Sequence, residues 1–380
     1  MRNGTGEILT RMRDAGPLSR AELSRQTRIS SAGVTKIIAQ LHSAGLVGER
    51  ELQEHSVGRP PVALHLNADA CGVLAIHLGA GQAQVAVFDL MLNAGPVHSA
   101  SFDLSDPIDS IIDVAVTLSR EVMQEAHSAR LKILGVGIGV PGSVDPTKRI
   151  NIHSVLAGWK NVPFAQAFEA ALGLPVVIEH NATAIAMAEA RYGDGREAES
   201  ILHLFLGQGL GAGFAQTGPG ERCSPVEIGH VAVNPGGPPC RCGGHGCLER
   251  YFSEKPLRQI VGDPGIARAD LVAAAMNTND WPTIYEYLLQ TVSTTVTLLG
   301  PERVILGGDL NTAPDAFLED LRRDLAPRVM PQQRERLKIE RTSLPGAAGV
   351  SGAACVALES FFYTAGPASS LNRLFPGATA

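Results

Sequence analysis

The chain has 380 residues, of which 44% are hydrophobic, and carries 32 Lys and Arg against 38 Asp and Glu. This length exceeds one hydrophobic core, so we expect two or three packed units. No apolar run is long enough to cross a bilayer, and the N-terminus lacks the features of a signal peptide, which excludes a membrane protein and predicts a cytoplasmic one.

Charge is distributed unevenly along the chain. Residues 1–65 hold nine basic and six acidic side chains, whereas the remaining residues hold 23 and 32. A net charge of +3 is therefore followed by a net charge of −9. This asymmetry indicates that only the N-terminal part contacts a polyanion such as DNA.

Three short helices are predicted near the N-terminus. Thr5 can cap the first helix, and "SRAE" at residues 19–22 is a capping box for the second. Ser30 or Ser31 begins the third helix, whose apolar residues recur at i, i+3, i+4 and i+7. Gly45 follows its last turn, in the position that favours glycine.

Two short strands follow, "LVGEREL" at residues 46–52 and "VALHLN" at 62–67, joined by "QEHSVGRPP" at 53–61. Three helices and a hairpin within about 65 residues are typical of a winged helix-turn-helix. The sequence therefore predicts a DNA-binding domain at residues 1–68.

The third predicted helix is the one that enters the major groove in such a domain. Ser31, Thr35 and Lys36 lie on the face opposite its apolar residues. Ser and Thr can read several base edges, and Lys reaches guanine or phosphate. The alternative is that these are ordinary solvated side chains.

A second DNA contact is predicted at the tip of the wing, which holds Gly58, Arg59 and Pro60. An arginine inserted into the minor groove there favours A·T-rich DNA, whose groove is narrow. The alternative is a turn that requires only glycine and proline.

From Ala70 onward, strands alternate with helices, which predicts an α/β fold over residues 69–380. Glycine turns repeatedly follow the strands, where open α/β folds bind ligands. The predicted elements are a hairpin at 72–90, a helix at 107–130, a buried strand at 132–142, a strand and helix at 174–193, two strands at 199–218, a helix at 283–299, a strand at 303–310 and a helix at 347–362.

Soft metal ligands are concentrated in "EIGHVAVNPGGPPCRCGGHGCLER" at residues 227–250. His230, Cys240, Cys242 and Cys247 supply one imidazole and three thiolates, the ligand set of a closed structural zinc site. Clustered cysteines in a reducing compartment bind metal more often than they form disulfides. A bound ion would also order a loop too rich in proline and glycine to build its own core. The alternative is a set of core cysteines beside a surface histidine.

The segment "CRCGGHGCLE" at residues 240–249, preceded by "EIGH" at 227–230, resembles the zinc and sugar-binding signature of the ROK family (repressors, open reading frames, kinases). The resemblance extends over roughly residues 70–380 and includes "GVGIGVPGSVD", "GWKNVP", "LFLGQGLGAGF" and "VILGGDL". It implies an actin-like, RNase H-like pair of lobes over residues 69–380, with a zinc loop at about 227–249. With a winged helix-turn-helix in front, the chain resembles the repressor branch of the family.

ROK kinases use a "DxGGTK" turn for metal and phosphate, an "LGTG" turn for the nucleotide, and the Asp of "END" as the base. In this chain His77 stands in place of the first Asp, Gln208 in place of the Thr, and Asn181 in place of the base. Loss of a general base typically costs about 10²–10⁴-fold in rate. Loss of the carboxylate that orients the metal removes charge neutralisation as well. The sequence therefore predicts that the kinase-like domain is inactive.

The residues that would contact a sugar are better kept. The family's "PNLxGW" appears here with Val155 for Asn, and His180 replaces the Asn of its "END". Glu227, His230 and Glu249 match the family positions that hydrogen-bond a bound sugar. The resemblance implies these ligand-binding residues: Glu227, His230, Glu249, Asn181, His180 and Gly142.

These observations predict a sugar-responsive regulator of transcription, most simply a repressor, with a structural Zn²⁺. We expect a homodimer or homotetramer on a two-fold symmetric operator in double-stranded DNA, because one helix-turn-helix contacts only a short half-site. One alternative is an ATP-dependent sugar kinase, of the glucokinase or N-acetylhexosamine kinase type, with a DNA-binding appendage. Another is a constitutive DNA-binding protein with a vestigial pocket.

Overall fold

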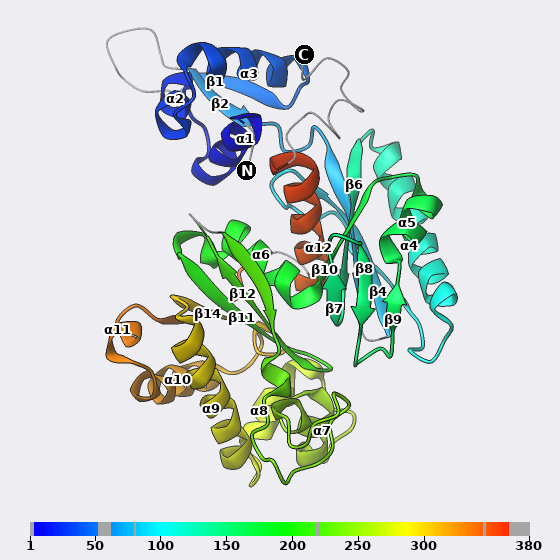
Figure 1. Cartoon of the computed structure of the whole chain (residues 1–380), viewed down its shortest axis with the longest axis vertical. Helices are drawn as coiled ribbons and strands as arrows, with labels where there is room; N and C mark the ends of the chain where they lie inside the picture. Colours follow the sequence, from blue (N-terminus) through cyan, green and yellow to red (C-terminus); the bar gives the residue numbers. More distant parts are fainter. Residues whose placement is uncertain (1–3, 52–61, 80, 218–220, 345–346, 365–380) are drawn as a thin grey trace.

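The computed structural model describes residues 4–51, 62–79, 81–217, 221–344 and 347–364. Figure 1 shows an N-terminal unit of helices α1 to α3 resting beside one of two larger lobes. The α/β fold with two lobes that the sequence predicted is confirmed. Among the described residues, none of the helices is long and apolar enough to span a membrane.

The N-terminal unit contains three helices and a two-stranded antiparallel sheet. The capping box predicted for α2 and the cap predicted for α3, at Ser30, are both present. Helix α1 already includes Gly4, so the prediction that Thr5 caps it is wrong. The elements are α1 (Gly4–Ala15), α2 (Arg20–Thr27), α3 (Ser31–Ser43), β1 (Val47–Glu51) and β2 (Val62–Leu66).

Lobe 1 is built on a five-stranded mixed sheet of order β5-β4-β3-β6-β10. The first three strands are antiparallel, whereas β6 and β10 run parallel to β3. Helices α4 and α5 lie on one face and α12 on the other (Figure 1). The elements are β3 (Gly72–Leu78), β4 (Gln82–Asp89), β5 (His98–Ser101), α4 (Ile108–Ser128), β6 (Ile133–Val140), α5 (Phe164–Leu172), β10 (Val176–His180), α12 (Ala348–Leu358) and a π turn, η6 (Glu359–Tyr363). A small sheet adjoins this lobe: β7 (Ser143–Asp145), β8 (Ile150–His153) and β9 (Lys160–Val162).

Lobe 2 is built on a second five-stranded sheet, of order β13-β12-β11-β14-β15. Neighbouring residues of β14 point to opposite faces of this sheet: Ile305 packs toward α6, whereas Val304 and Leu306 join the core of α9 and α10. Its strands and inner helix are α6 (Asn181–Tyr192), β11 (Ser200–Leu206), β12 (Leu210–Gln216), β13 (Arg222–Val226), β14 (Arg303–Gly308) and β15 (Lys338–Arg341). The outer helices are α7 (Glu254–Val261), α8 (Leu271–Met276), α9 (Trp281–Leu299), α10 (Asp315–Leu325) and α11 (Pro331–Arg334). Short 3-10 turns complete it: η1 (Asp194–Glu197), η2 (Ile228–His230), η3 (Leu248–Arg250), η4 (Arg268–Asp270) and η5 (Ala326–Arg328).

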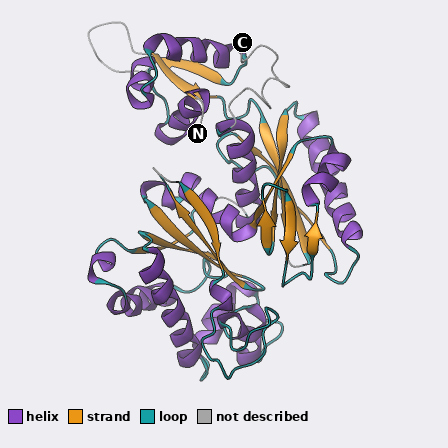
Figure 2. Ribbon diagram, in the orientation of Figure 1, coloured by secondary structure: helices purple, strands orange, loops and turns teal. Residues whose placement is uncertain are grey.

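The two large sheets share one topology. In each, three consecutive antiparallel strands are followed by two strands parallel to the first. Figure 2 shows the two sheets in orange, each with helices packed against it. The lobes are therefore built on the same strand plan.

Helices α6 and α12 cross where the lobes meet. A Cβ added at Gly352 of α12 would lie 2.8 Å from the backbone of Ala184 and Ile185 in α6, so only glycine permits this approach. On its other side, α12 joins a continuous apolar core that extends from lobe 1 into the N-terminal unit. This core includes Leu9 of α1 and Phe362 of η6. The N-terminal unit is therefore packed against lobe 1 and not merely tethered to it.

Candidate metal centre and sugar cleft

The four predicted metal ligands lie together. One ligand atom from each of His230, Cys240, Cys242 and Cys247 can be chosen so that all four are within 4.8 Å of one another. Cys240 Sγ is 3.7 Å from His230 Nδ1, and Cys242 Sγ is 3.6 Å from Cys247 Sγ. Ligands about 2.3 Å from a tetrahedral ion lie about 3.8 Å apart, so these spacings fit one zinc-sized ion. All six cysteines of the chain are free, and the sulfur separation is far beyond a disulfide bond.

The loop between these ligands, residues 231–247, has almost no core of its own. Only Cys240, Gly246 and Cys247 are buried within it. Backbone bonds shape the loop, among them Cys240 N to the Gly244 carbonyl at 2.8 Å and Val233 N to the Gly246 carbonyl at 2.9 Å. Because two of the three buried residues are predicted ligands, a bound ion would be the main source of the loop's order.

Two of the predicted sugar contacts occupy the start of α6. His180 is the last residue of β10 and Asn181 the first of α6. Burial lowers the pKa of His180, and the nearby charge of Glu227 opposes this, which places Glu227 of lobe 2 beside His180. His180 Nδ1 and Asn181 Oδ1 are buried without a hydrogen-bond partner within the described ranges. Such atoms typically cost about 1–3 kcal/mol each, so a ligand or water that satisfies them would be stabilising.

Glu249 lies in η3 and holds the end of the glycine turn "LGQG" at residues 206–209. Its Oε2 accepts a hydrogen bond from Leu210 N at 3.2 Å, directly after the turn that contains Gln208. Gln208 itself is exposed. One oxygen of Glu249 is thus committed to the backbone of lobe 2, and any ligand contact would share this carboxylate.

Gly142 has a local structural reason to be glycine. Its φ is +86°, and an added Cβ would lie 2.5 Å from the Cα of Ser154. The close approach of this turn to the segment after β8 explains the residue without a ligand. Its predicted role as a sugar contact remains a prediction.

His77 is the residue before the last of β3 and faces α12. Burial lowers its pKa to about 4, so the imidazole is neutral at pH 7, and its Nδ1 lies 3.3 Å from Gln84 Oε1. An added Cβ at Gly349, in the first turn of α12, would lie 2.5 Å from the His77 ring. The side chain therefore fills the space between strand and helix, and it offers no negative charge to orient a metal ion.

A cavity of about 600 Å³ opens beside the cysteine-rich loop and α7. Four cationic side chains that the sequence analysis did not single out line it together with Glu249: Arg241, Arg250, Lys255 and Arg258. Arg241 Nη1 lies 3.5 Å from the carbonyl oxygen of Leu156, which adjoins lobe 1, so the loop reaches across the cleft. The sequence offered a local signal only for Arg241 and Arg250, which lie within the cysteine-rich segment, because Lys255 and Arg258 come from α7.

The predicted DNA contacts on α3 are exposed, as expected. Ser31, Thr35 and Lys36 all face solvent, whereas Val34 and Ile38 are fully buried. The Thr35 hydroxyl donates to the Ser31 carbonyl at 2.8 Å, which leaves its oxygen as an acceptor. The other predicted contacts, Gly58, Arg59 and Pro60, lie outside the described residues.

Residues 73–360 match the ROK family. This chain belongs to the ROK family. The DNA-binding transcriptional repressor Mlc of Escherichia coli (strain K12) is 26% identical over 379 residues, which cover 92% of each chain. The putative xylose repressor of Caldicellulosiruptor sp. (strain Rt8B.4) is also 26% identical, over 92% of this chain and 94% of its own. A glucokinase of Halalkalibacterium halodurans is 27% identical but covers only 60% of this chain.

Solved structures show the same division between a regulator that covers most of this chain and a kinase that covers less of it. A ROK family transcriptional regulator, described as a homologue of the E. coli MLC protein, superposes on this ROK protein with a TM-score of 0.78 and 26% identity. It covers 95% of this chain and 96% of its own. A ROK family glucokinase from Streptomyces griseus gives a TM-score of 0.62 at 23% identity, covers 75% of this chain and shows the shared fold alone.

Proposed function

We propose that this ROK protein is a DNA-binding repressor of transcription whose operator affinity changes when a sugar binds between its lobes. The main support is the share of the chain that its relatives match. Relatives named as repressors match 92% of the chain, including most of the part outside residues 73–360. In this proposal residues 1–68 form the winged helix-turn-helix and residues 69–380 the sugar-binding domain.

A structural Zn²⁺ is proposed as the cofactor, held by His230, Cys240, Cys242 and Cys247. Four protein ligands leave no open position, so the ion orders the loop and performs no chemistry. His230 Nδ1 is the ring nitrogen near Cys240, and this leaves Nε2 for a sugar hydroxyl. Ligand binding and loop position would then be linked through one imidazole.

The sugar is proposed to bind through Glu227, Glu249, His180, Asn181 and His230, with the Gly142 turn beside it. Support comes from the two unsatisfied atoms of His180 and Asn181 and from the proximity of Glu227 to His180. Carboxylate, imidazole and amide groups are suited to the hydroxyls of a neutral sugar.

No phosphoryl transfer is proposed. Asn181 cannot accept a proton from a sugar hydroxyl at neutral pH, and the neutral, partly buried His77 cannot orient a divalent ion. The kinase alternative keeps one point in its favour, the shared fold with sugar kinases.

DNA is proposed to contact Ser31, Thr35 and Lys36 in the major groove and Gly58, Arg59 and Pro60 in the minor groove. The N-terminal segment carries net charge +3 on an otherwise acidic chain, which favours phosphate contacts there. Paired half-sites require two copies of the chain, so a homo-oligomer is part of the proposal.

One experiment tests the proposal. First, glucose, xylose and N-acetylglucosamine are screened for thermal stabilisation of the purified chain. Second, DNA that binds the chain is selected from a random pool. Third, the affinity of the chain for the selected DNA is measured with and without each sugar that stabilises it. Glu227→Gln is the matched variant, because Glu227 is exposed and its loss leaves the core intact. We expect a sugar effect of about tenfold that the variant weakens. Operator affinity indifferent to every sugar, or ATP-dependent phosphorylation lost in Glu227→Gln, would overturn the proposal.

A further inference from the structure

A buried ion pair joins the N-terminal unit to lobe 1. Arg13, near the end of α1, donates from Nη1 to Glu359 Oε1 at 2.6 Å, and their side chains are only 5% and 6% exposed. The guanidinium also stacks between two rings, 4.9 Å from the centroid of Tyr192 and 4.7 Å from that of Tyr363. Asp14 accepts from Arg13 Nε at 2.7 Å. Arg13 is therefore fixed in a pocket that lobe 1 and α6 provide.

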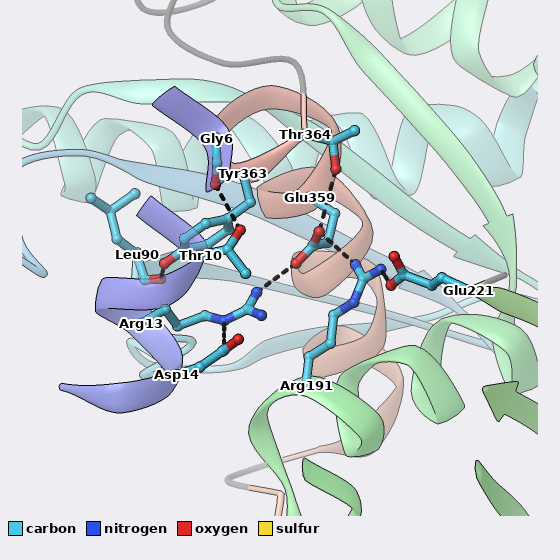
Figure 3. A network of polar contacts seen from close by, with 10 residues as sticks. All are labelled: Gly6, Thr10, Arg13, Asp14, Leu90, Arg191, Glu221, Glu359, Tyr363 and Thr364. Carbon is cyan, nitrogen blue, oxygen red and sulfur yellow. Dashed lines mark hydrogen bonds and ion pairs between the residues drawn. The ribbon is translucent and has the colours of Figure 1, made fainter. Parts of the chain in front are cut away.

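The same carboxylate binds a second arginine. Glu359 Oε2 lies 2.7 Å from Arg191 Nη1, and Arg191 in turn pairs with Glu221, the residue before β13 in lobe 2. Figure 3 shows Glu359 between the two guanidinium groups, with Glu221 on the far side of Arg191. One carboxylate thus connects α1, lobe 1 and lobe 2 within a single buried cluster.

Helix α6 links this cluster to the proposed sugar site. Its first residue is Asn181, its cap is His180, and Arg191 and Tyr192 are its last two residues. Twelve residues of α-helix span about 18 Å as a nearly rigid rod. A displacement at the sugar end of α6 is therefore transmitted to the position of Arg191.

Helix α12 forms the opposing element. It begins beside His77 of β3 and leads directly into η6, which carries Glu359. Because α6 and α12 touch backbone to backbone at Gly352, a movement of one lobe against the other would turn the two helices about this point. Arg191 and Glu359, beyond the crossing, would then move relative to each other.

We propose that Glu359 is the positioning residue that couples the sugar cleft to the DNA-binding unit: movement of α6 shifts Arg191 against Glu359, and Glu359 reorients Arg13 and helix α1. Asp14, the other carboxylate bound to Arg13, belongs to α1 itself, so it is the ion pair with Glu359 that ties this buried guanidinium to lobe 1. The inference rests on the proposed function, since it needs a sugar at one end of α6 and DNA at α3.

Glu359→Gln is the decisive variant, because glutamine keeps the shape of the side chain and removes the charge that both arginines share. Arg13→Lys is the second variant, because it keeps the positive charge and loses the planar guanidinium that pairs with Glu359. It replaces Glu359→Gln in the experiment if that variant does not fold. The control is Glu340→Gln, which breaks an ion pair of 2.8 Å with Arg303 inside the sheet of lobe 2. Arg303 is 11% exposed, as is Arg191, whereas Glu340 itself is 31% exposed.

Two measurements are made on the full chain. The first is amide hydrogen exchange of residues 4–15 without any ligand. The second is affinity for the selected DNA, with and without whichever of glucose, xylose or N-acetylglucosamine stabilises the wild type. We expect Glu359→Gln to speed exchange in α1, to bind the sugar as the wild type does, and to reduce the sugar effect on DNA affinity by about tenfold. We expect Glu340→Gln to change none of these.

Each outcome is decisive. A wild type that responds to sugar and a Glu359→Gln variant that responds equally would overturn the coupling while sparing the proposed function. A wild type without any sugar response would overturn the proposed function. In that case the exchange measurement still decides whether Glu359 holds α1 in place, because unchanged exchange in Glu359→Gln and Arg13→Lys would refute it.

Discussion

Replacing Glu189 with glutamine tests whether the middle of α6 holds a buried, uncharged acid. Glu189 is fully buried, and burial raises its pKa from 4.5 to about 7. Thr342 donates a hydrogen bond to its Oε1, and His203 Nε2 lies 4.0 Å from the same oxygen. Burial lowers the pKa of His203 to about 3, so at neutral pH the imidazole carries no charge that could balance a carboxylate.

The pH dependence follows from these two states of Glu189. The folded chain keeps a proton that the unfolded chain, with a pKa of 4.5, has already released, so stability falls as pH rises from 4.5 through 7. The whole pKa shift corresponds to about 3 kcal/mol in the free energy of unfolding, of which about 2 kcal/mol is lost between pH 5.5 and 8.5. Because glutamine does not titrate, the free energy of unfolding of Glu189→Gln rises by about 2 kcal/mol relative to that of the wild type between pH 5.5 and 8.5. The contribution of His203 is common to both proteins and cancels.

The assay is urea denaturation at pH 5.5 and 8.5, followed by the fluorescence of Trp281 in lobe 2 in a Trp159→Phe background. Glu286→Gln is the control: Arg328 lowers the pKa of this exposed carboxyl, so it is ionised at both pH values and its effect is constant. A Glu189→Gln effect that is equal at both pH values, or destabilising at pH 8.5, would show that Glu189 is ionised in the fold and pairs with His203.

Three further outcomes are expected. The purified chain contains one zinc per molecule by mass spectrometry, and Cys247→Ser loses the ion and melts at a lower temperature. The control Cys71→Ser, at a buried thiol in lobe 1, retains the ion. Equal zinc content in both variants would exclude the four-ligand site. Lys36→Ala weakens operator binding and lowers the slope of log affinity against log salt by about one, while Lys148→Ala leaves both unchanged, as gel-shift titrations would report. Asn181→Asp does not gain ATP-dependent phosphorylation of any sugar in a coupled assay, because the carboxylate that orients the metal is still absent; measurable turnover would show that Asn181 alone blocks the reaction.

Local patterns in the sequence predicted much of the candidate site. Cys240, Cys242 and Cys247 fall within eight residues, so a single loop brings them together, and only His230 had to reach them from outside that segment. The exposed face of α3 followed from the spacing of its apolar residues, since helix periodicity alone separates buried from exposed positions. The α2 and α3 caps followed in the same way from a few adjacent residues.

Contacts between distant segments were beyond such patterns. His180 was predicted as a sugar contact by resemblance, but its proximity to Glu227 depends on how the lobes face each other. Gly142 was assigned to ligand approach, whereas the structure gives it a packing reason, because its turn lies against Ser154. The cations around the cavity became visible only when the loop and α7 were placed side by side.

The sequence by itself predicted the elements of the N-terminal unit, the main strands and helices of the lobes in their order, and a candidate set of metal ligands, because caps, periodicity and ligand spacing act over a few residues. It did not predict β5, α5, β13, α10 or β15. Only the tertiary structure decided that both lobes share one strand plan, since strand order is set by pairing between segments far apart. It also decided that Arg13 and Glu359, 346 residues apart, form one buried ion pair with Arg191 beside it. No local pattern encodes such a pair, because its formation depends on the closure of nearly the whole chain around it.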